Sequence, residues 1–160
     1  MLGKLLKRKL QVFAPVTGQL ISLEEVPDPT FSKKMLGDGI AIMPSEGKIY
    51  SPVDAEITYL PATKHAIGLR TRDGTELLIH IGLETVSLKG RGFRHFVKQG
   101  MDVKAGHILV EVDLDYVGEN AKSIITPIVI TNSAVREITT SKKTSNCTAG
   151  KTVIMIVTKK

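Results

Sequence analysis

The chain has 160 residues, 42% of them hydrophobic and 24% charged, and this balance is typical of a single compact globular domain. Its net charge of +6 comes from scattered Lys and Arg residues without an accompanying aromatic stripe, so nucleic-acid binding is not expected. One cysteine, Cys147, excludes an intramolecular disulfide, and the chain shows neither a secretory leader nor a membrane-spanning apolar run. These features predict a cytoplasmic protein, and no cofactor is expected.

The first ten residues, MLGKLLKRKL, place four leucines near one helical face among four cations. They are expected to form either a basic amphipathic segment with weak contact to a membrane surface or a flexible tail. Residues 11–160 are expected to form one domain, with its principal motifs at about 31–135.

The remainder alternates short apolar runs with Gly and Pro, a pattern that predicts many short strands. Very short helices are expected at 30–36, after the Asp28-Pro29 turn, and at 114–121. Two weak internal repeats of turn residues, 14–20 with 51–57 and 103–106 with 147–150, support a mostly β sandwich. The expected strands are 11–14, 19–23, 39–43, 57–60, 66–71, 75–82 and 124–130.

Two of these strands flank Arg72-Asp73-Gly74-Thr75, and Asp-Gly predicts a two-residue hairpin loop. Such a loop pairs His80 with Ile67, which makes His65 a diagonal neighbour of His80 on the same face. A three-residue loop would reverse the relative facing of the two strands. The predicted core row is Leu77, Ile79 and Ile81, and the predicted histidine side carries Leu78, Ile67 and Leu69.

Two imidazoles on an apolar surface resist joint protonation, so at least one nitrogen stays neutral near pH 7. A neutral nitrogen serves as a nucleophile or as a metal ligand. The sequence has neither His-x-His nor His-Glu-x-x-His, which disfavours a zinc hydrolase, although a zinc shared by His65, His80 and a partner carboxylate stays open. Phosphoryl transfer needs hydrogen-bond donors beside the nucleophile, and Thr63 is either a solvent-facing turn hydroxyl or a residue that fixes the tautomer of His65.

The histidines stand within longer motifs at 14–18, 26–28, 37–42, 51–54, 61–66, 77–86 and 126–132. Taken in order, these motifs resemble the enzyme IIA components of the glucose class of the bacterial phosphoenolpyruvate-dependent sugar phosphotransferase system. The resemblance implies a single type-1 EIIA domain with an antiparallel, barrel-like β-sandwich of the duplicated hybrid-motif type. It also implies a phosphotransferase component that works through a phosphohistidine.

The resemblance further implies roles for individual residues. His80 would accept phosphate from the histidine phosphocarrier protein HPr and pass it to the EIIB domain of a sugar permease, with His65 and Thr63 assisting. Regulation of transporters or kinases by phosphorylation state is an alternative that can coexist with transfer. Arg91 stands where many relatives have an acidic residue. Partners would dock on a shallow apolar face formed by Phe31, Ile40, Ile42 and Val86 and bordered by Asp28 and Glu84.

Overall fold

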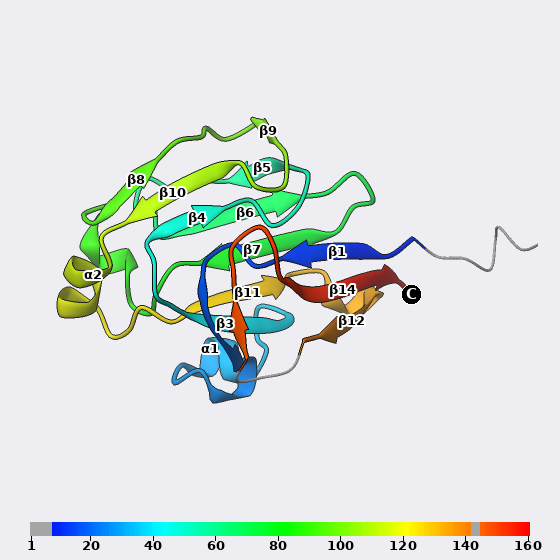
Figure 1. Ribbon diagram of the computed structural model, residues 1–160, viewed down its shortest axis with the longest axis horizontal. Helices are drawn as coiled ribbons and strands as arrows, with labels where there is room; N and C mark the ends of the chain where they lie inside the picture. Colours follow the sequence, from blue (N-terminus) through cyan, green and yellow to red (C-terminus); the bar gives the residue numbers. More distant parts are fainter. Residues whose placement is uncertain (1–7, 142–144) are drawn as a thin grey trace, which may run out of the picture.

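The protein was analysed as a computed structural model, which describes residues 8–141 and 145–160. Short strands dominate it, as the sequence predicts (Figure 1). Two short α-helices, α1 (Pro29–Ser32) and α2 (Leu114–Asn120), and the 3-10 turns η2 (Leu23–Glu25), η3 (Val86–Leu88) and η4 (Ser133–Val135) connect them. The strands are β1 (Leu10–Phe13), β2 (Gly18–Ser22), β3 (Asp38–Pro44), β4 (Lys48–Tyr50), β5 (Ala55–Tyr59), β6 (Ala66–Arg70), β7 (Glu76–His80), β8 (Phe93–His95), β9 (Asp102–Val103), β10 (Ile108–Val112), β11 (Thr126–Ile130), β12 (Arg136–Thr140), β13 (Asn146–Cys147) and β14 (Val153–Lys159).

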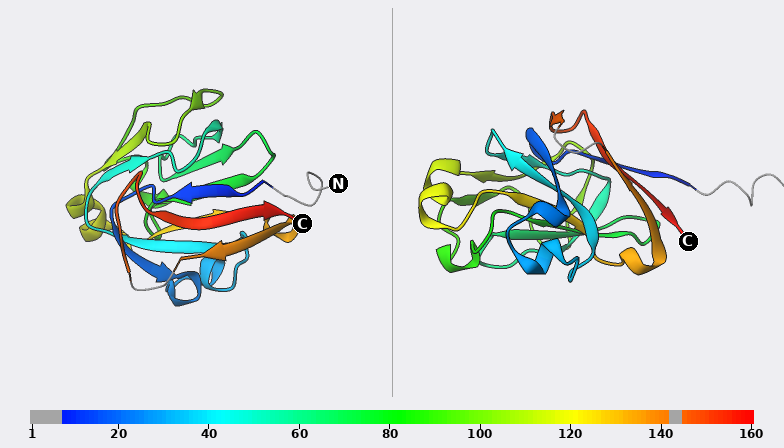
Figure 2. Two further views of the ribbon diagram at one scale, coloured as in Figure 1. Left: turned by 45° about the vertical axis from the view of Figure 1, so that its right-hand side comes forward. Right: turned by 90° about the horizontal axis from the view of Figure 1, so that it is seen from below.

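The strands form three antiparallel sheets. The largest has the order β13-β2-β3-β11-β7-β6-β5-β9, and the two smaller sheets are β1-β14-β12 and β4-β10-β8. Both small sheets lie over one face of the large sheet (Figure 2). Within the described residues β13 and β9 remain the edges of the large sheet, so the expected sandwich is confirmed and it does not close into a barrel.

The main core fills the space between these layers. Leu77, Ile79 and Ile81 all belong to it, which confirms the predicted core row. A second, smaller cluster covers the other face of the large sheet, where α1 and η2 pack. The central strands are therefore buried on both faces, as the uniformly buried β11 shows. The second cluster comprises Leu23, Val26, Phe31, Ala41, Leu83, Ile125 and Val129.

The hairpin between β6 and β7 has a three-residue loop, so the predicted two-residue loop is wrong. The amide of Thr71 donates to the carbonyl of Thr75 at 2.9 Å, and Ala66 rather than Ile67 pairs with His80. Asp73 stabilises the longer loop, because its carboxylate accepts hydrogen bonds from the Thr71 hydroxyl and the Thr75 amide. The one-residue shift turns the side chains of Ile67 and Leu69 into the main core, so their predicted place beside the histidines is wrong.

The ends of the predicted elements differ in smaller ways. The helix expected at 30–36 ends at Ser32, because Lys34 adopts a left-handed conformation with φ of 55°. The helix expected at 114–121 is confirmed as α2, where Asp113 caps the first turn by accepting from the Tyr116 amide at 3.0 Å. The first strand begins at Leu10. Residues 1–7 of the basic segment predicted at 1–10 lie outside the described residues.

Candidate functional site: a histidine pair beside β7

His80 is the last residue of β7, and His65 lies just before the start of β6, the strand that pairs with β7. Their ring centroids are 5.1 Å apart with an interplanar angle of 76°, which confirms that the two histidines lie together. The reason differs from the predicted one. His65 follows Lys64, whose φ is 60°, so the strand alternation does not extend back to His65 and the ring reaches the His80 side despite the shifted register.

A backbone carbonyl determines which nitrogen of His80 is free. Nδ1 of His80 lies 2.8 Å from the carbonyl oxygen of Gly82. A carbonyl can only accept, so Nδ1 carries the proton and Nε2 keeps an unshared electron pair. Nε2 is therefore the nitrogen of His80 that is available to act as a nucleophile or a ligand.

The turn after β7 holds that carbonyl in place, a feature that sequence reasoning missed. Gly82 has φ of 75°, and the Thr85 hydroxyl donates to the carbonyl of Ile81 at 2.6 Å. Thr85 is fully buried, and the Leu83 amide donates to the Ser123 carbonyl at 2.8 Å. The sequence signal that could have located this turn is the Gly directly after an apolar strand, followed three residues later by Thr.

Thr63 makes the hydrogen bond predicted for it. Its hydroxyl lies 2.7 Å from Nδ1 of His65. When the hydroxyl donates to Nδ1, the proton of His65 sits on Nε2, which can then donate to an anionic group held between the two rings. The pair thus contains one imidazole with a free electron pair and one able to donate.

Burial keeps both imidazoles neutral near pH 7. It lowers the pKa of His80, although the hydrogen bond to Gly82 and the negative charge of Asp28 act in the opposite direction. Burial also lowers the pKa of His65, and a charge on His80 would lower it further. A neutral imidazole is required for a nucleophile, so the electrostatics agree with the hydrogen bonding.

The residues expected to dock partners divide into two groups. Phe31 packs against His80 with ring centroids 5.0 Å apart, while Val86 is 54% exposed and Glu84 is exposed beside it. Asp28, half-buried at the start of α1, accepts from the Thr30 amide at 3.0 Å. Phe31 and Asp28 therefore lie at His80, and Glu84 and Val86 are exposed in the turn that follows β7.

Ile40 and Ile42 do not contribute to this surface, and their predicted place on it is wrong. They are only 1% and 0% exposed and belong to the main core. Their strand, β3, lies between β2 and β11, and the side chains of Ile40 and Ile42 point into the main core on one face of the large sheet. Phe31 is itself only 2% exposed, so it packs against the His80 ring rather than forming open surface.

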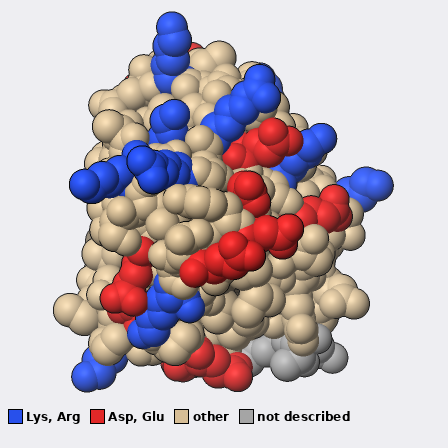
Figure 3. Space-filling view, turned by 90° about the vertical axis from the view of Figure 1, so that its left-hand side faces the viewer, with Lys and Arg blue, Asp and Glu red and all other residues tan. Residues whose placement is uncertain are grey.

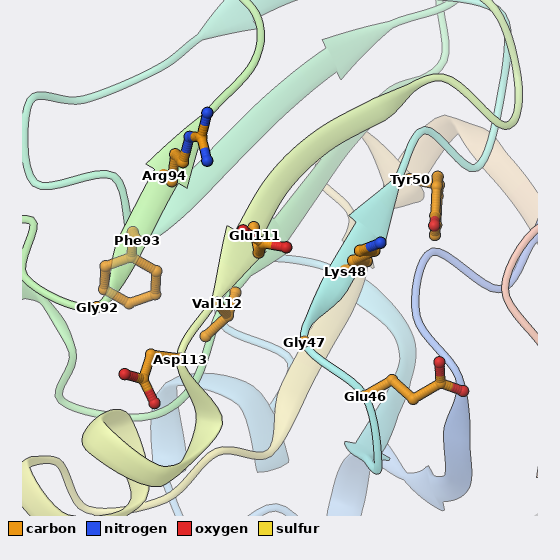
Figure 4. A pocket seen from close by; sticks show the side chains of 10 residues that line it. All are labelled: Glu46, Gly47, Lys48, Tyr50, Gly92, Phe93, Arg94, Glu111, Val112 and Asp113. Carbon is orange, nitrogen blue, oxygen red and sulfur yellow. The ribbon is translucent and has the colours of Figure 1, made fainter.

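A groove lies away from the histidine pair. A shallow groove of about 720 Å³ runs over β4, β8 and β10, where Lys48, Glu111 and Arg94 stand on neighbouring strands (Figure 4). None of the predicted site residues lines it. No group of three or more His, Cys, Asp or Glu side chains within residues 8–141 and 145–160 is arranged to hold a metal ion.

An open antiparallel sandwich that holds a neutral histidine with an unshared electron pair beside a second histidine has the groups that histidine-dependent group transfer needs. Residues 10–135 match the family model described as the phosphoenolpyruvate-dependent sugar phosphotransferase system, EIIA 1. The chain belongs to this family, and it is a phosphoryl carrier for sugar import that acts as a phosphotransferase component through a phosphohistidine.

Individual relatives agree with the family match. The chain is 51% identical over 149 residues to the glucose-specific EIIA component of Bacillus anthracis, covering 93% of this chain and 90% of that protein. It is 43% identical over 156 residues to the glucose-specific EIIA component of Staphylococcus epidermidis, covering 98% and 94%. The solved structure of glucose permease IIA from Mycoplasma capricolum matches with a TM-score of 0.88 and 42% identity, covering 93% of this chain and 96% of that one.

Family membership implies other components of the phosphotransferase system as partners. In the described part of the chain, no helix combines the length and apolar character needed to cross a membrane.

Proposed function

We propose that His80 is the phosphorylated residue, and that it takes the phosphoryl group from the histidine phosphocarrier protein HPr and passes it to the EIIB domain of a sugar permease. The observation that carries this proposal is the hydrogen bond between Nδ1 of His80 and the Gly82 carbonyl, which leaves Nε2 free. The sugar is proposed to be glucose, because the relatives from Bacillus anthracis and Staphylococcus epidermidis are named glucose-specific. The reaction is proposed to take place in the cytoplasm.

The transfer needs no acid or base on this chain. The Nε2 electron pair of His80 attacks phosphorus and forms an N–P bond, while the bond between phosphorus and the donor imidazole breaks and its electron pair returns to the donor. Nδ1 keeps its proton throughout, because the Gly82 carbonyl accepts from it. Onward transfer is the same step in reverse, with the EIIB nucleophile attacking phosphorus.

His65 and Thr63 are proposed to stabilise the transferring group. The Thr63 hydroxyl donates to Nδ1 of His65, so that the Nε2 proton of His65 points to a phosphoryl oxygen. Asp28, Glu84, Val86 and Phe31 are proposed to contribute to the contact with either partner, the first three directly and Phe31 by supporting the His80 ring.

The experiment is phosphorylation with phosphoenolpyruvate, enzyme I and HPr, followed by mass spectrometry at alkaline pH, which preserves phosphohistidine. One phosphoryl group on His80 is expected in the native protein, and none in His80→Ala. His65→Ala is expected to spare acceptance more than onward transfer. A normal level of labelled phosphate on His80→Ala would overturn the assignment.

A further inference from the structure

The segment that follows the His80 turn has an unusual charge content. Residues 85–101 contain four Lys or Arg residues and no Asp or Glu. Figure 3 shows Lys and Arg side chains gathered over the upper part of one side of the molecule, with a band of Asp and Glu side chains crossing below them. The upper part of this view is the level of β8, which this segment forms.

Three cations lie on this segment and on the loop that carries His65, and we call Lys64, Lys89 and Arg91 the basic arc. Lys64 directly precedes His65, and Lys89 and Arg91 are exposed in the turn after η3. The two loops touch, because a Cβ placed on Gly90 would lie 3.7 Å from Cδ of Lys64. The arc therefore joins two separate parts of the chain at one edge of the site.

The turn that carries Lys89 and Arg91 is well ordered by its backbone. The Lys89 amide donates to the Val86 carbonyl at 3.2 Å, and the Arg91 amide donates to the Leu88 carbonyl at 3.1 Å. Leu88 is buried in the main core and anchors the turn. The two cations are thus held at fixed backbone positions beside the exposed side chain of Val86.

The arc forms no ion pair with a carboxylate in the part of the chain that the structure describes. The ion pairs found among residues 8–141 and 145–160 involve Lys34, Arg70 and Lys104, and none involves a member of the arc. Gathering like charges without counter-ions is unfavourable, and a surface with carboxylates would relieve it on binding. Asp28, whose charge acts on His80, and Glu84, exposed in the turn after β7, carry the opposite charge, so this region has basic and acidic residues.

We propose that the basic arc binds carboxylates on the interface of a protein that exchanges phosphoryl groups with His80, and that it fixes the orientation in which this partner docks. This inference rests on the proposed function. The loop that carries Lys64 also carries His65, and it contacts the turn that carries Lys89 and Arg91, so a partner docked over the histidine pair reaches the arc. A protein fits better than an anionic membrane, because Asp28 and Glu84 would repel a uniformly negative surface, whereas a partner with both charges matches each side.

The test reverses two charges that lie outside the proposed transfer machinery. Lys89→Glu with Arg91→Glu is compared with Lys151→Glu and Lys159→Glu, two exposed lysines of the β14 region that impose the same change in net charge. Rates of phosphoryl transfer from purified HPr and to a purified EIIB domain are measured for both variants and the native chain. Circular dichroism and thermal unfolding verify that each variant is folded.

The arc variant is expected to slow at least one of the two transfers about tenfold at low salt, whereas the control variant stays within about twofold of native. The difference is expected to shrink at about 0.5 M salt, where the Debye length is about 4 Å. Equal rates for the arc variant and the native chain in both transfers would overturn the inference, as would equal losses in the two variants. The inference would also be overturned if the arc variant kept native rates of both transfers but bound vesicles containing anionic phosphatidylglycerol less than the native chain does. Failure of the proposed function would be recognised separately, because the native chain itself would then accept no phosphate.

Discussion

Substituting Gly82 by Ala should lower the stability of the protein and weaken the hydrogen bond that orients His80, because the conformation of Gly82 is needed for both. Its φ of 75° costs an Ala side chain about 1 kcal/mol. The new Cβ would lie 2.6 Å from Cγ2 of Thr85 and 2.8 Å from the carbonyl oxygen of Ser123, and neither the buried Thr85 nor the backbone can move away freely. Such overpacking adds about 1–3 kcal/mol. The expected loss of unfolding free energy is about 2–4 kcal/mol, or about 4–16 °C in Tm for a chain of this size.

A matched control exists at Gly150, whose φ of 73° is nearly the same but whose Cβ would meet nothing within 4 Å. Gly150→Ala should cost only the conformational term, about 2–4 °C in Tm. Relief of the clash at Gly82 should also move its carbonyl away from Nδ1 of His80, so that acceptance of phosphate slows about tenfold, equivalent to about 1.4 kcal/mol. Thermal unfolding and HPr-dependent phosphorylation measure the two effects. A Gly82→Ala protein that matches Gly150→Ala in both would refute the reasoning.

Three further outcomes are expected. Asp28→Asn keeps a residue that can cap α1 but removes the negative charge that raises the pKa of His80. NMR titration should therefore show a lower pKa for His80 in this variant. An unchanged pKa would contradict an electrostatic effect of Asp28 on His80. Thr63→Val removes the partner of Nδ1 of His65 and should slow onward transfer about tenfold in a quench-flow assay, while equal onward rates would argue against positioning. Folding lowers the pKa values of His65 and His80, so below about pH 6.5 the unfolded chain binds more protons than the folded chain. The free energy of unfolding, measured with urea, should therefore decrease as the pH falls below this value. If His80→Gln shows the same decrease as the native chain, the two histidines are not its cause.

The sequence predicts the β-rich fold well, because Gly and Pro separate short apolar runs throughout the chain. It predicts the register of the β6–β7 hairpin badly. Asp-Gly favours a two-residue loop in general, but the hydrogen bonds from Thr71 and Thr75 to Asp73 stabilise a three-residue loop here, and those bonds depend on side-chain geometry. The histidines nevertheless lie together, because Lys64, the residue before His65, has a left-handed backbone conformation instead of a strand conformation.

Surface and interior could not be separated from the sequence for the apolar docking residues. Ile40 and Val86 are equally apolar, but β3 lies inside a sheet covered on both faces, whereas η3 lies on the outside. The role of the Gly82 carbonyl was also beyond sequence reasoning, because a carbonyl direction depends on backbone angles and on the buried Thr85 hydrogen bond. The proximity of the two histidines was therefore predictable, and the backbone groups that orient their rings were not.

The most direct test of the account follows the ring nitrogens of His80 by NMR in protein labelled with 15N at histidine, before and after phosphorylation by phosphoenolpyruvate, enzyme I and HPr. Before the reaction, the proton of His80 should be on Nδ1, held by the Gly82 carbonyl. Afterwards the phosphorus should be bonded to Nε2 of His80, with Nδ1 still protonated and His65 unmodified. Phosphorus on Nδ1 of His80, or on either nitrogen of His65, would contradict the account.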